Sequence, residues 1–497
     1  MAKKTINKEL TGAQDLYNFL FEACNIIRGP VSQDNFKDYI TPLLYYKRIS
    51  DVYDEETEEA LISSGGDKEY ASLPEQHRFV IPDGCHWQEV RERTENLGAA
   101  IVGAMRQIEI ANPDTLYGVL SMFSSQKWTN KAILNDSKIR DLIEHLSKRK
   151  LGNKDYPADL MGDAYEILLK KFADDSKAQA GEFYTPRSVV RLLVHILDPQ
   201  PGETVYDPAC GSGGMLIEAI RYMHDDSLCC GSIFGQEKNV VNAAIAKMNL
   251  FLHGASDFNV MQGDTLRDPK ILQGGNIAKF DCVIANPPFS LENWGATEWS
   301  SDKYKRNIYG TPSDSCGDYA WIQHMICSMS SGKGRMAVVM PQGILFRGNQ
   351  EVEIRKQLVE SDLIEAVVTL GDKLFYGTGL SPCFLIIRRM KPAHHSGRIL
   401  MIDGSKILTQ KRAQNILEEN DIDRLYSLYQ NYSDEEDYSR IVTLQEIRDK
   451  EYNLSPNRYV VYHKEEIRPY AEVLAEFKQA YADVKRLENE FSLLINA

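Results

Sequence analysis

Residues 281–290 read Asp-Cys-Val-Ile-Ala-Asn-Pro-Pro-Phe-Ser, and this stretch predicts a buried strand followed at once by a rigid turn. The apolar run from Cys282 to Ala285 is typical of a strand in a parallel sheet that is covered on both faces. Two prolines then end the strand, because proline donates no ladder hydrogen bond and fixes its own φ. We therefore expect the turn to lie at the carboxyl end of a strand, where open α/β sheets bind their ligands.

The turn itself, Asn286-Pro287-Pro288-Phe289, combines two hydrogen-bond acceptors with an aromatic ring. The Asn286 side-chain oxygen and the Pro287 carbonyl can accept the two N–H groups of an exocyclic amine. Phe289 offers a flat apolar face for an aromatic base. This combination suits a flipped-out adenine held for attack on a methyl donor. A plain strand-ending turn is the alternative, since Asn-Pro is a common turn dipeptide.

A second candidate ligand site lies upstream, where a short strand ends at Asp207 and a helix begins near Met215. The turn between them contains Gly211, Ser212, Gly213 and Gly214. Glycines let the backbone approach a ligand, and a helix N-terminus supplies free N–H groups. Leu216 stands where the third glycine of a dinucleotide-binding loop belongs. Asp207, with the proline after it, favours the methionyl amino group of S-adenosylmethionine instead.

Two acidic residues continue the series. Glu237 ends a strand-like run and can accept both hydroxyls of a ribose, and Asp264 ends the next run, placed to contact an adenine amine of the cofactor. Either residue alone could equally be a solvated surface acid. Because they are spaced one strand–helix unit apart and lead into Asn286, we expect all three to share one pocket along a sheet edge.

The order of these segments resembles that of adenine-N6 DNA methyltransferases. Residues 181–187, Gly-Glu-Phe-Tyr-Thr-Pro-Arg, are similar to a further cofactor-binding segment of that family. Their position ahead of the glycine turn resembles the modification (M) subunit of type I restriction-modification systems. Further stretches similar to that subunit are 36–53, 318–324, 335–345 and 375–379. The resemblance covers most of the chain and is looser in its last third.

The resemblance implies an α/β fold in three parts. We expect residues 1–155 to form a helical N-terminal domain. Residues 156–462 would form a doubly wound, Rossmann-like, S-adenosylmethionine-dependent methyltransferase domain, and residues 463–497 a C-terminal helical tail for subunit assembly. The sequence pattern agrees, because apolar strands alternate with helices up to about residue 400. Residues 400–462 are expected to be irregular.

The resemblance also assigns the site residues. Catalysis would fall to Asn286, Pro287, Pro288 and Phe289. S-adenosyl-L-methionine would be bound by Glu182, Phe183, Tyr184, Thr185, Pro186, Arg187, Asp207, Gly211, Ser212, Gly213, Gly214, Glu237, Asp264 and Asn286. We expect direct methyl transfer, with no metal and no covalent enzyme intermediate.

The implied reaction is methylation of adenine N6 in a specific sequence of double-stranded DNA, with the adenine flipped out of the helix. A separate specificity (S) subunit is expected to read the DNA. Two M subunits would join each S subunit, and a restriction (R) subunit would complete the complex. A protein-glutamine methyltransferase, whose substrate presents a similar planar NH₂ group, and an inactive assembly scaffold are the alternatives.

Length and composition set further bounds. A chain of 497 residues allows two or three domains with sizeable cores. The sequence contains no run of 18 apolar residues and no charged-then-apolar leader, so we expect neither a membrane span nor a signal peptide. Nine cysteines lie scattered with no C-x-x-C pair, which favours a reduced, cytoplasmic protein without zinc.

The formal net charge of −14 opposes tight DNA binding, which depends on neutralising phosphates. Either a local basic face or a partner that carries recognition would resolve this. Candidate basic patches are 148–150 and 303–306, although short charge runs are usually solvated. From Lys464 the chain predicts one helix with an apolar stripe at heptad spacing, broken at Glu488. This helix packs either on its own protein or on the helical spacers of the specificity subunit.

Overall fold

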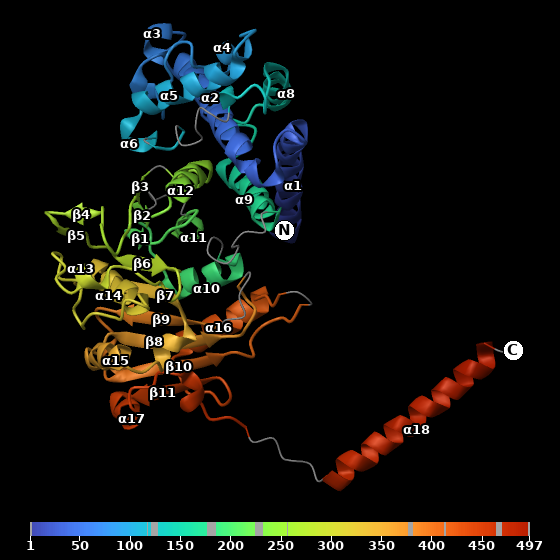
Figure 1. Cartoon of the computed structure of the whole chain (residues 1–497), viewed down its shortest axis with the longest axis vertical. Coiled ribbons are helices and arrows are strands. Elements are labelled where there is room, and N and C mark those ends of the chain that lie inside the picture. The colour runs from blue at the N-terminus through green and yellow to red at the C-terminus, as the bar shows by residue number, and fades with distance from the viewer. Residues whose placement is uncertain are drawn as a thin grey trace.

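The computed structural model describes residues 2–116, 118–120, 128–175, 185–223, 232–255, 257–375, 381–411, 414–463 and 470–495. Figure 1 shows a helical region at one end, a sheet covered by helices in the middle, and a long C-terminal helix that stands apart from both. None of the helices in the described part of the chain combines the length and apolarity needed to cross a membrane.

The helical region is built from the first third of the chain. Its helices are α1 (Ala2–Ile27), α2 (Lys37–Ser63), α3 (Lys68–Ala71), α4 (Trp87–Arg91), α5 (Leu97–Ala111), α6 (Pro113–Leu116), α8 (Asp136–Leu146) and α9 (Ala158–Asp175). Apolar residues recur at helical spacing in 16–27 and 40–52, and these stretches lie in α1 and α2. Buried side chains of these helices, α3 excepted, share one apolar core, which also includes residues of α12 (Val240–Leu252) from the sheet region.

A nine-stranded sheet forms the centre of the molecule. Its strands are β1 (Val205–Asp207), β2 (Ile233–Glu237), β3 (Phe258–Gln262), β6 (Cys282–Ala285), β7 (Arg335–Pro341), β8 (Ile364–Leu370), β9 (Pro382–Arg388), β10 (Arg398–Gly404) and β11 (Ser439–Thr443). Their order across the sheet is β11-β10-β8-β9-β7-β6-β1-β2-β3. All of these strands run in one direction except β9 and β11. A separate hairpin joins β4 (Leu272–Gln273) to β5 (Asn276–Ile277).

Helices cover both faces of this sheet, as the unbroken apolar run of β6 predicts. Cys282 and Ile284 face a core shared with α10 (Arg187–Leu197), α11 (Gly214–Met223) and α16 (Glu419–Asn431). Val283 and Ala285 face the opposite core, shared with α14 (Asp318–Ser328), α15 (Gln350–Glu360) and α17 (Leu444–Asp449). The prediction of a doubly wound α/β fold behind a helical N-terminal region is therefore confirmed.

The expectation that residues 400–462 are irregular is wrong. This stretch contains most of β10, together with α16, β11 and α17, and it extends the sheet by two strands beyond β8.

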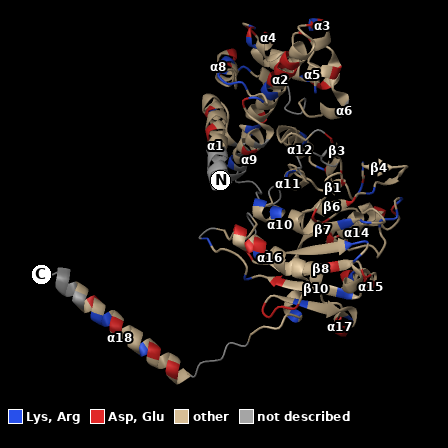
Figure 2. Ribbon diagram, turned by 180° about the vertical axis from the view of Figure 1, so that it is seen from behind, with Lys and Arg blue, Asp and Glu red and all other residues tan. Residues whose placement is uncertain are grey.

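Figure 2 shows acidic residues on α16 and basic residues on α10. One ion pair, from Arg191 to Glu419, joins these two helices.

The predicted tail helix is present as α18 (Tyr470–Ile495), while residues 464–469 lie outside the described residues. It projects into solvent and carries acidic and basic residues intermixed along its length (Figure 2). Its apolar side chains are exposed, including Phe477 at 65% and Phe491 at 64%. A helix packed on its own protein, the simpler alternative, is not what the structure contains.

Candidate active site

Asn286 is the first residue after β6, and the two ends of its side-chain amide differ in their surroundings. The Nδ2 group donates a hydrogen bond to Thr185 Oγ1 at 2.9 Å. The Oδ1 atom is buried and accepts no hydrogen bond from any residue that the structure describes. Buried side-chain oxygens almost always have a partner. A free acceptor at the carboxyl end of a parallel strand is therefore a candidate ligand contact.

The rest of the turn presents an aromatic ring. Pro287 is buried, Pro288 is exposed and Phe289 is half-buried. The Phe289 ring packs against the core under α10 and α11 and lies 6.4 Å from the ring of Phe375, centre to centre, at an angle of 54°. Residues 376–379, which sequence similarity grouped with Phe375, lie outside the described residues.

A buried carboxylate holds the far end of this turn. Ser290 has a left-handed backbone (φ +51°), and its amide donates to Asp318 Oδ1 at 2.7 Å. The other Asp318 oxygen pairs with Arg347 Nη1 at 2.7 Å, and Arg347 also reaches the Ser290 hydroxyl at 3.3 Å. Asp318 is completely buried at the start of α14, so the turn is anchored to a rigid element.

The glycine turn lies at the end of β1, one strand away from β6. Gly211 (φ +53°) and Gly213 (φ +85°) adopt left-handed conformations, which explains the need for glycine there. The Gly211 amide donates to Glu237 Oε2 at 3.0 Å, so the ends of β1 and β2 are tied together. α11 begins at Gly214, as the glycine turn predicts.

Three carboxylates follow one another along this edge. Asp207 is buried and accepts from the Ala209 amide at 2.9 Å. Burial, together with the nearby Glu237 charge, raises the pKa of Asp207 to about 8. Burial also raises the pKa of Glu237, which accepts a second backbone hydrogen bond from Asn239 at 2.7 Å. Asp264 follows β3, where it pairs with Lys238 at 2.9 Å and caps its own turn.

Residues 181–187 are the stretch that resembles a further cofactor-binding segment of the family. The structure describes this stretch only from Thr185 onward, so Glu182, Phe183 and Tyr184 lie outside the described residues. Pro186 precedes the first residue of α10. Arg187 approaches Asp163, Glu166 and Glu218 at 3.5–3.7 Å, which fixes this helix to α9 and α11.

Comparisons with known proteins agree with this arrangement. A model of the N-6 DNA methylase family matches residues 156–467, and a model of the HsdM N-terminal domain matches residues 16–146. The chain belongs to the N-6 DNA methylase family. It is 35% identical over 471 residues to the type I restriction enzyme MjaVII methylase subunit of Methanocaldococcus jannaschii, an alignment that covers 90% of this chain and 78% of the relative.

Two further relatives support the same assignment. The HindI methylase subunit of Haemophilus influenzae is 31% identical over 396 residues, which cover 76% of this chain and 84% of the relative. A solved type I methyltransferase subunit from Streptococcus thermophilus superposes with a TM-score of 0.76 at 26% identity, covering 91% of this chain and all of that one. The protein is thus a type I modification subunit and an N6-adenine DNA methyltransferase. The protein-glutamine and inactive-scaffold alternatives fall away.

One arginine of each predicted basic patch is engaged within the protein, whereas the lysines of both patches are exposed, so DNA contact by those lysines stays a prediction. Arg306 of this DNA methyltransferase is buried rather than presented to DNA. Its guanidinium pairs with Asp302 at 2.8 Å and donates to the backbone carbonyls of Thr265 and Leu266, also at 2.8 Å. It therefore ties the loop after the catalytic turn to the Asp264 turn. Arg149 of the other patch pairs with Asp15 at 2.6 Å.

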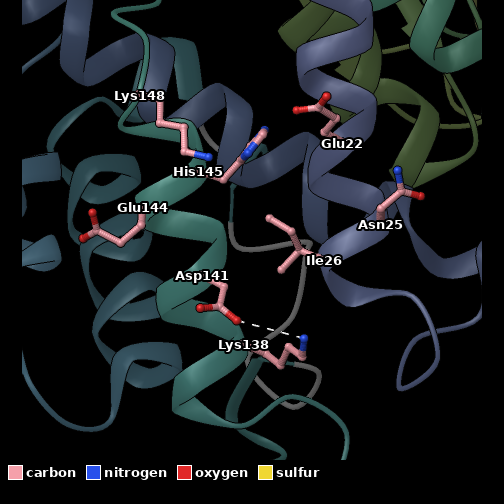
Figure 3. Close-up of a pocket in the computed structure, with 8 residues that line it drawn as sticks. All are labelled: Glu22, Asn25, Ile26, Lys138, Asp141, Glu144, His145 and Lys148. Carbon is pink, nitrogen blue, oxygen red and sulfur yellow. Dashed lines mark ion pairs between the residues drawn. The ribbon is translucent and has the colours of Figure 1, made fainter.

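A cavity of about 500 Å³ lies far from this edge, between α1 and α8 of the helical region (Figure 3). Its lining side chains include Glu22, Asp141 and Lys148. Because it shares no residue with the β1, β2 and β6 termini, it has no part in the site described above.

The Asp318–Arg347 clamp was not predicted from the sequence. Asp318 begins a stretch similar to the M subunit and Arg347 lies just beyond another, and nothing in their spacing indicated a contact with Ser290. The contacts join positions 28 and 57 residues apart in the sequence, so they depend on how α14 and the end of β7 return to β6.

Proposed function

We propose that this chain transfers a methyl group from S-adenosyl-L-methionine to N6 of an adenine flipped out of double-stranded DNA. The observation that carries the proposal is the buried Asn286 oxygen, which has no partner in the described part of the chain. It lies at the strand end next to the glycine turn. A neutral acceptor in that place suits an exocyclic amine, which can only donate.

The residues along this edge fit S-adenosyl-L-methionine by their chemistry. Asp207 offers a carboxylate to the methionyl ammonium group, Glu237 to the ribose hydroxyls and Asp264 to the adenine amine. A Cβ atom on Gly211 would meet no other atom within 4 Å, so there is space above the turn. When bound, S-adenosyl-L-methionine supplies an electrophilic methyl group on its sulfonium sulfur.

The chain's own groups act on the target amine. The N6 lone pair of adenine is delocalised into the ring and is poorly nucleophilic. Hydrogen bonds from its N–H groups to Asn286 Oδ1 and the Pro287 carbonyl would localise that pair and aim it. Stacking on Phe289 contributes about 1–3 kcal/mol, which offsets part of the few kcal/mol that base flipping costs. Positioning of this kind can lower a barrier by ~7–11 kcal/mol in favourable cases.

Substitution of Asn286 tests the proposal. Asn286→Ala removes the acceptor but touches neither Asp207 nor Glu237. We expect it to abolish methylation, measured as tritium transfer to DNA, while calorimetric affinity for S-adenosyl-L-methionine stays close to wild type. The loss of a single hydrogen bond is expected to lower activity about tenfold. A folded variant that keeps more than about a tenth of wild-type activity would therefore reject the role of Asn286.

We further propose that a specificity subunit brings this chain to its DNA sequence, with two M subunits per S subunit and a restriction subunit in the full complex. The net charge of −14 supports a partner that carries recognition. The exposed apolar residues of α18 support that helix as the assembly element, because such a surface is rarely left in water.

A further inference from the structure

We propose that Thr185 is a positioning residue: its hydroxyl accepts from the Asn286 amide nitrogen and restrains the side chain in the position in which the oxygen faces the target amine. Sequence similarity assigns Thr185 to the cofactor instead. The inference rests on the proposed role of Asn286 and deepens it by naming the group that restrains the Asn286 side chain.

The hydrogen-bond geometry carries this assignment. An Asn amide has nearly the same shape in its two orientations, so shape alone cannot decide which end faces the ligand. Here the Nδ2 end donates to Thr185 Oγ1 at 2.9 Å, and the Oδ1 end is left buried without a partner among the described residues. The reverse orientation would turn an NH₂ group toward an amine that also donates, and two donors repel.

Thr185 is well placed to act as a fixed reference point. It directly precedes Pro186, whose carbonyl accepts from the Val189 and Val190 amides at 2.9 and 3.1 Å in the first turn of α10. Both valines are buried in the core that also contains β6 residues. Thr185 therefore lies just ahead of a helix that shares its core with β6, the strand that Asn286 follows.

This assignment predicts a specific kinetic signature. If the hydroxyl serves Asn286, its removal leaves the amide free to rotate and lowers the rate of the chemical step. If it serves the cofactor, its removal weakens cofactor binding, and saturating S-adenosyl-L-methionine restores the rate. The two roles differ in whether kcat or the cofactor Kd changes.

The test compares Thr185→Val, which removes only the hydroxyl, with Thr185→Ser, which keeps it. The variants are purified as the complex with the specificity subunit, and methyl transfer is measured on DNA carrying the site that the complex modifies. We expect Thr185→Val to lower kcat about tenfold at saturating S-adenosyl-L-methionine, as for the loss of one hydrogen bond. Thr185→Ser should retain the wild-type kcat, and the calorimetric Kd for S-adenosyl-L-methionine should be unchanged in both.

Thr57→Val is the matched control, because Thr57 is also half-buried and hydrogen-bonded but lies on α2 in the helical region. It should leave kcat and Kd as in the wild type. A Thr185→Val variant with wild-type kcat and a raised Kd would overturn the inference in favour of a cofactor contact. If Asn286→Ala stays active, the proposed function itself fails; if it is inactive while Thr185→Val retains full kcat, only the positioning role fails.

Discussion

At the end of β1, the Asp207 carboxyl group is almost fully buried, with the Ala209 amide as its hydrogen-bond donor and the Glu237 carboxylate nearby. Burial raises its pKa to about 8, so the group is largely protonated at neutral pH in the free chain. A ligand with an ammonium group binds the ionised form, because the two charges attract. Binding should therefore release a proton from Asp207.

This linkage gives a pH prediction for cofactor binding. Between pH 6 and 7.5, the affinity for S-adenosyl-L-methionine should rise with pH by up to about tenfold per pH unit, because binding releases close to one proton. The pH range ends at 7.5 because an α-amino group has a pKa of about 7.7–8.0, and below it the ligand's ammonium group keeps most of its charge. Calorimetry in buffers of different ionisation enthalpy measures the released proton. Asp207→Asn should bind more weakly and without this slope; a wild-type affinity that is flat with pH contradicts the assignment.

At the scale of single residues, the sequence predicted well where chemistry is local. Asn286, Phe289 and the glycine turn follow from residue types beside strand ends. The orientation of the Asn286 amide could not be predicted, because its partner lies 101 residues earlier in the chain. Arg306 was misinterpreted for a similar reason: two of the acceptors that bury it are backbone carbonyls about 40 residues away.

At the scale of elements, the catalytic turn is a short segment held between β6 and α14. Its left-handed Ser290 is stabilised by Asp318, which is paired in turn with Arg347. A turn held in this way keeps the Phe289 ring and the Pro287 carbonyl at a fixed distance from the Asn286 side chain. Loss of the clamp should therefore displace the acceptors without touching the glycine turn.

Substitution of Asp318 tests this clamp. Asp318→Ala leaves the Ser290 amide and Arg347 without their acceptor, and a displacement of about 1 Å can cost on the order of 10²-fold in rate. We expect kcat to fall by that order while the Kd for S-adenosyl-L-methionine stays close to wild type. Asp318→Asn keeps an acceptor for the Ser290 amide and should retain more activity than Asp318→Ala.

Glu365→Gln supplies the control for general loss of stability. Glu365 is buried like Asp318 and pairs with Arg388. It lies near the start of β8, whereas the catalytic turn follows the end of β6. Because β8 and β6 run in the same direction, Glu365 lies at the edge of the sheet opposite the catalytic turn. Removal of either buried carboxylate should cost ~3–5 kcal/mol of stability, seen as a lower Tm. Only Asp318→Ala should also lose kcat. Equal kcat in both variants would exclude a role for the clamp in catalysis.

The sheet was predictable as far as its strands are continuously apolar. β6, β7, β8 and β9 are buried along nearly their whole length, and their apolar runs indicated them directly. β11 was missed because it is a five-residue edge strand with only two buried positions, preceded by an acidic loop. Its pairing with β10 is antiparallel and depends on α16 bringing the chain back, which no local pattern indicates.

At the scale of the whole molecule, the chain forms a body, made of the helical region and the sheet with its covering helices, and a separate C-terminal helix, α18, that projects into solvent. Each predicted catalytic or cofactor residue in the described ranges lies in the body, at the strand ends of β1, β2, β3 and β6 or at the start of α10. α18 follows the last strand and carries a row of exposed apolar side chains that nothing in the described body covers. Deletion of this helix should leave the sheet and its strand-end site unchanged.

The last prediction is that residues 464–497 are needed for the complex but not for cofactor binding. The truncated chain should fold, because the core clusters contain no residue from α18. It should bind S-adenosyl-L-methionine with the wild-type Kd by calorimetry. On size-exclusion chromatography it should fail to co-elute with the specificity subunit, and methylation of DNA should be lost with the complex, since the acidic body alone has little affinity for phosphates. Phe477→Ala with Phe491→Ala in the full chain should weaken the complex in the same direction without shortening the helix. If the truncated chain still forms the complex, another surface carries assembly and the exposed row on α18 serves a different partner.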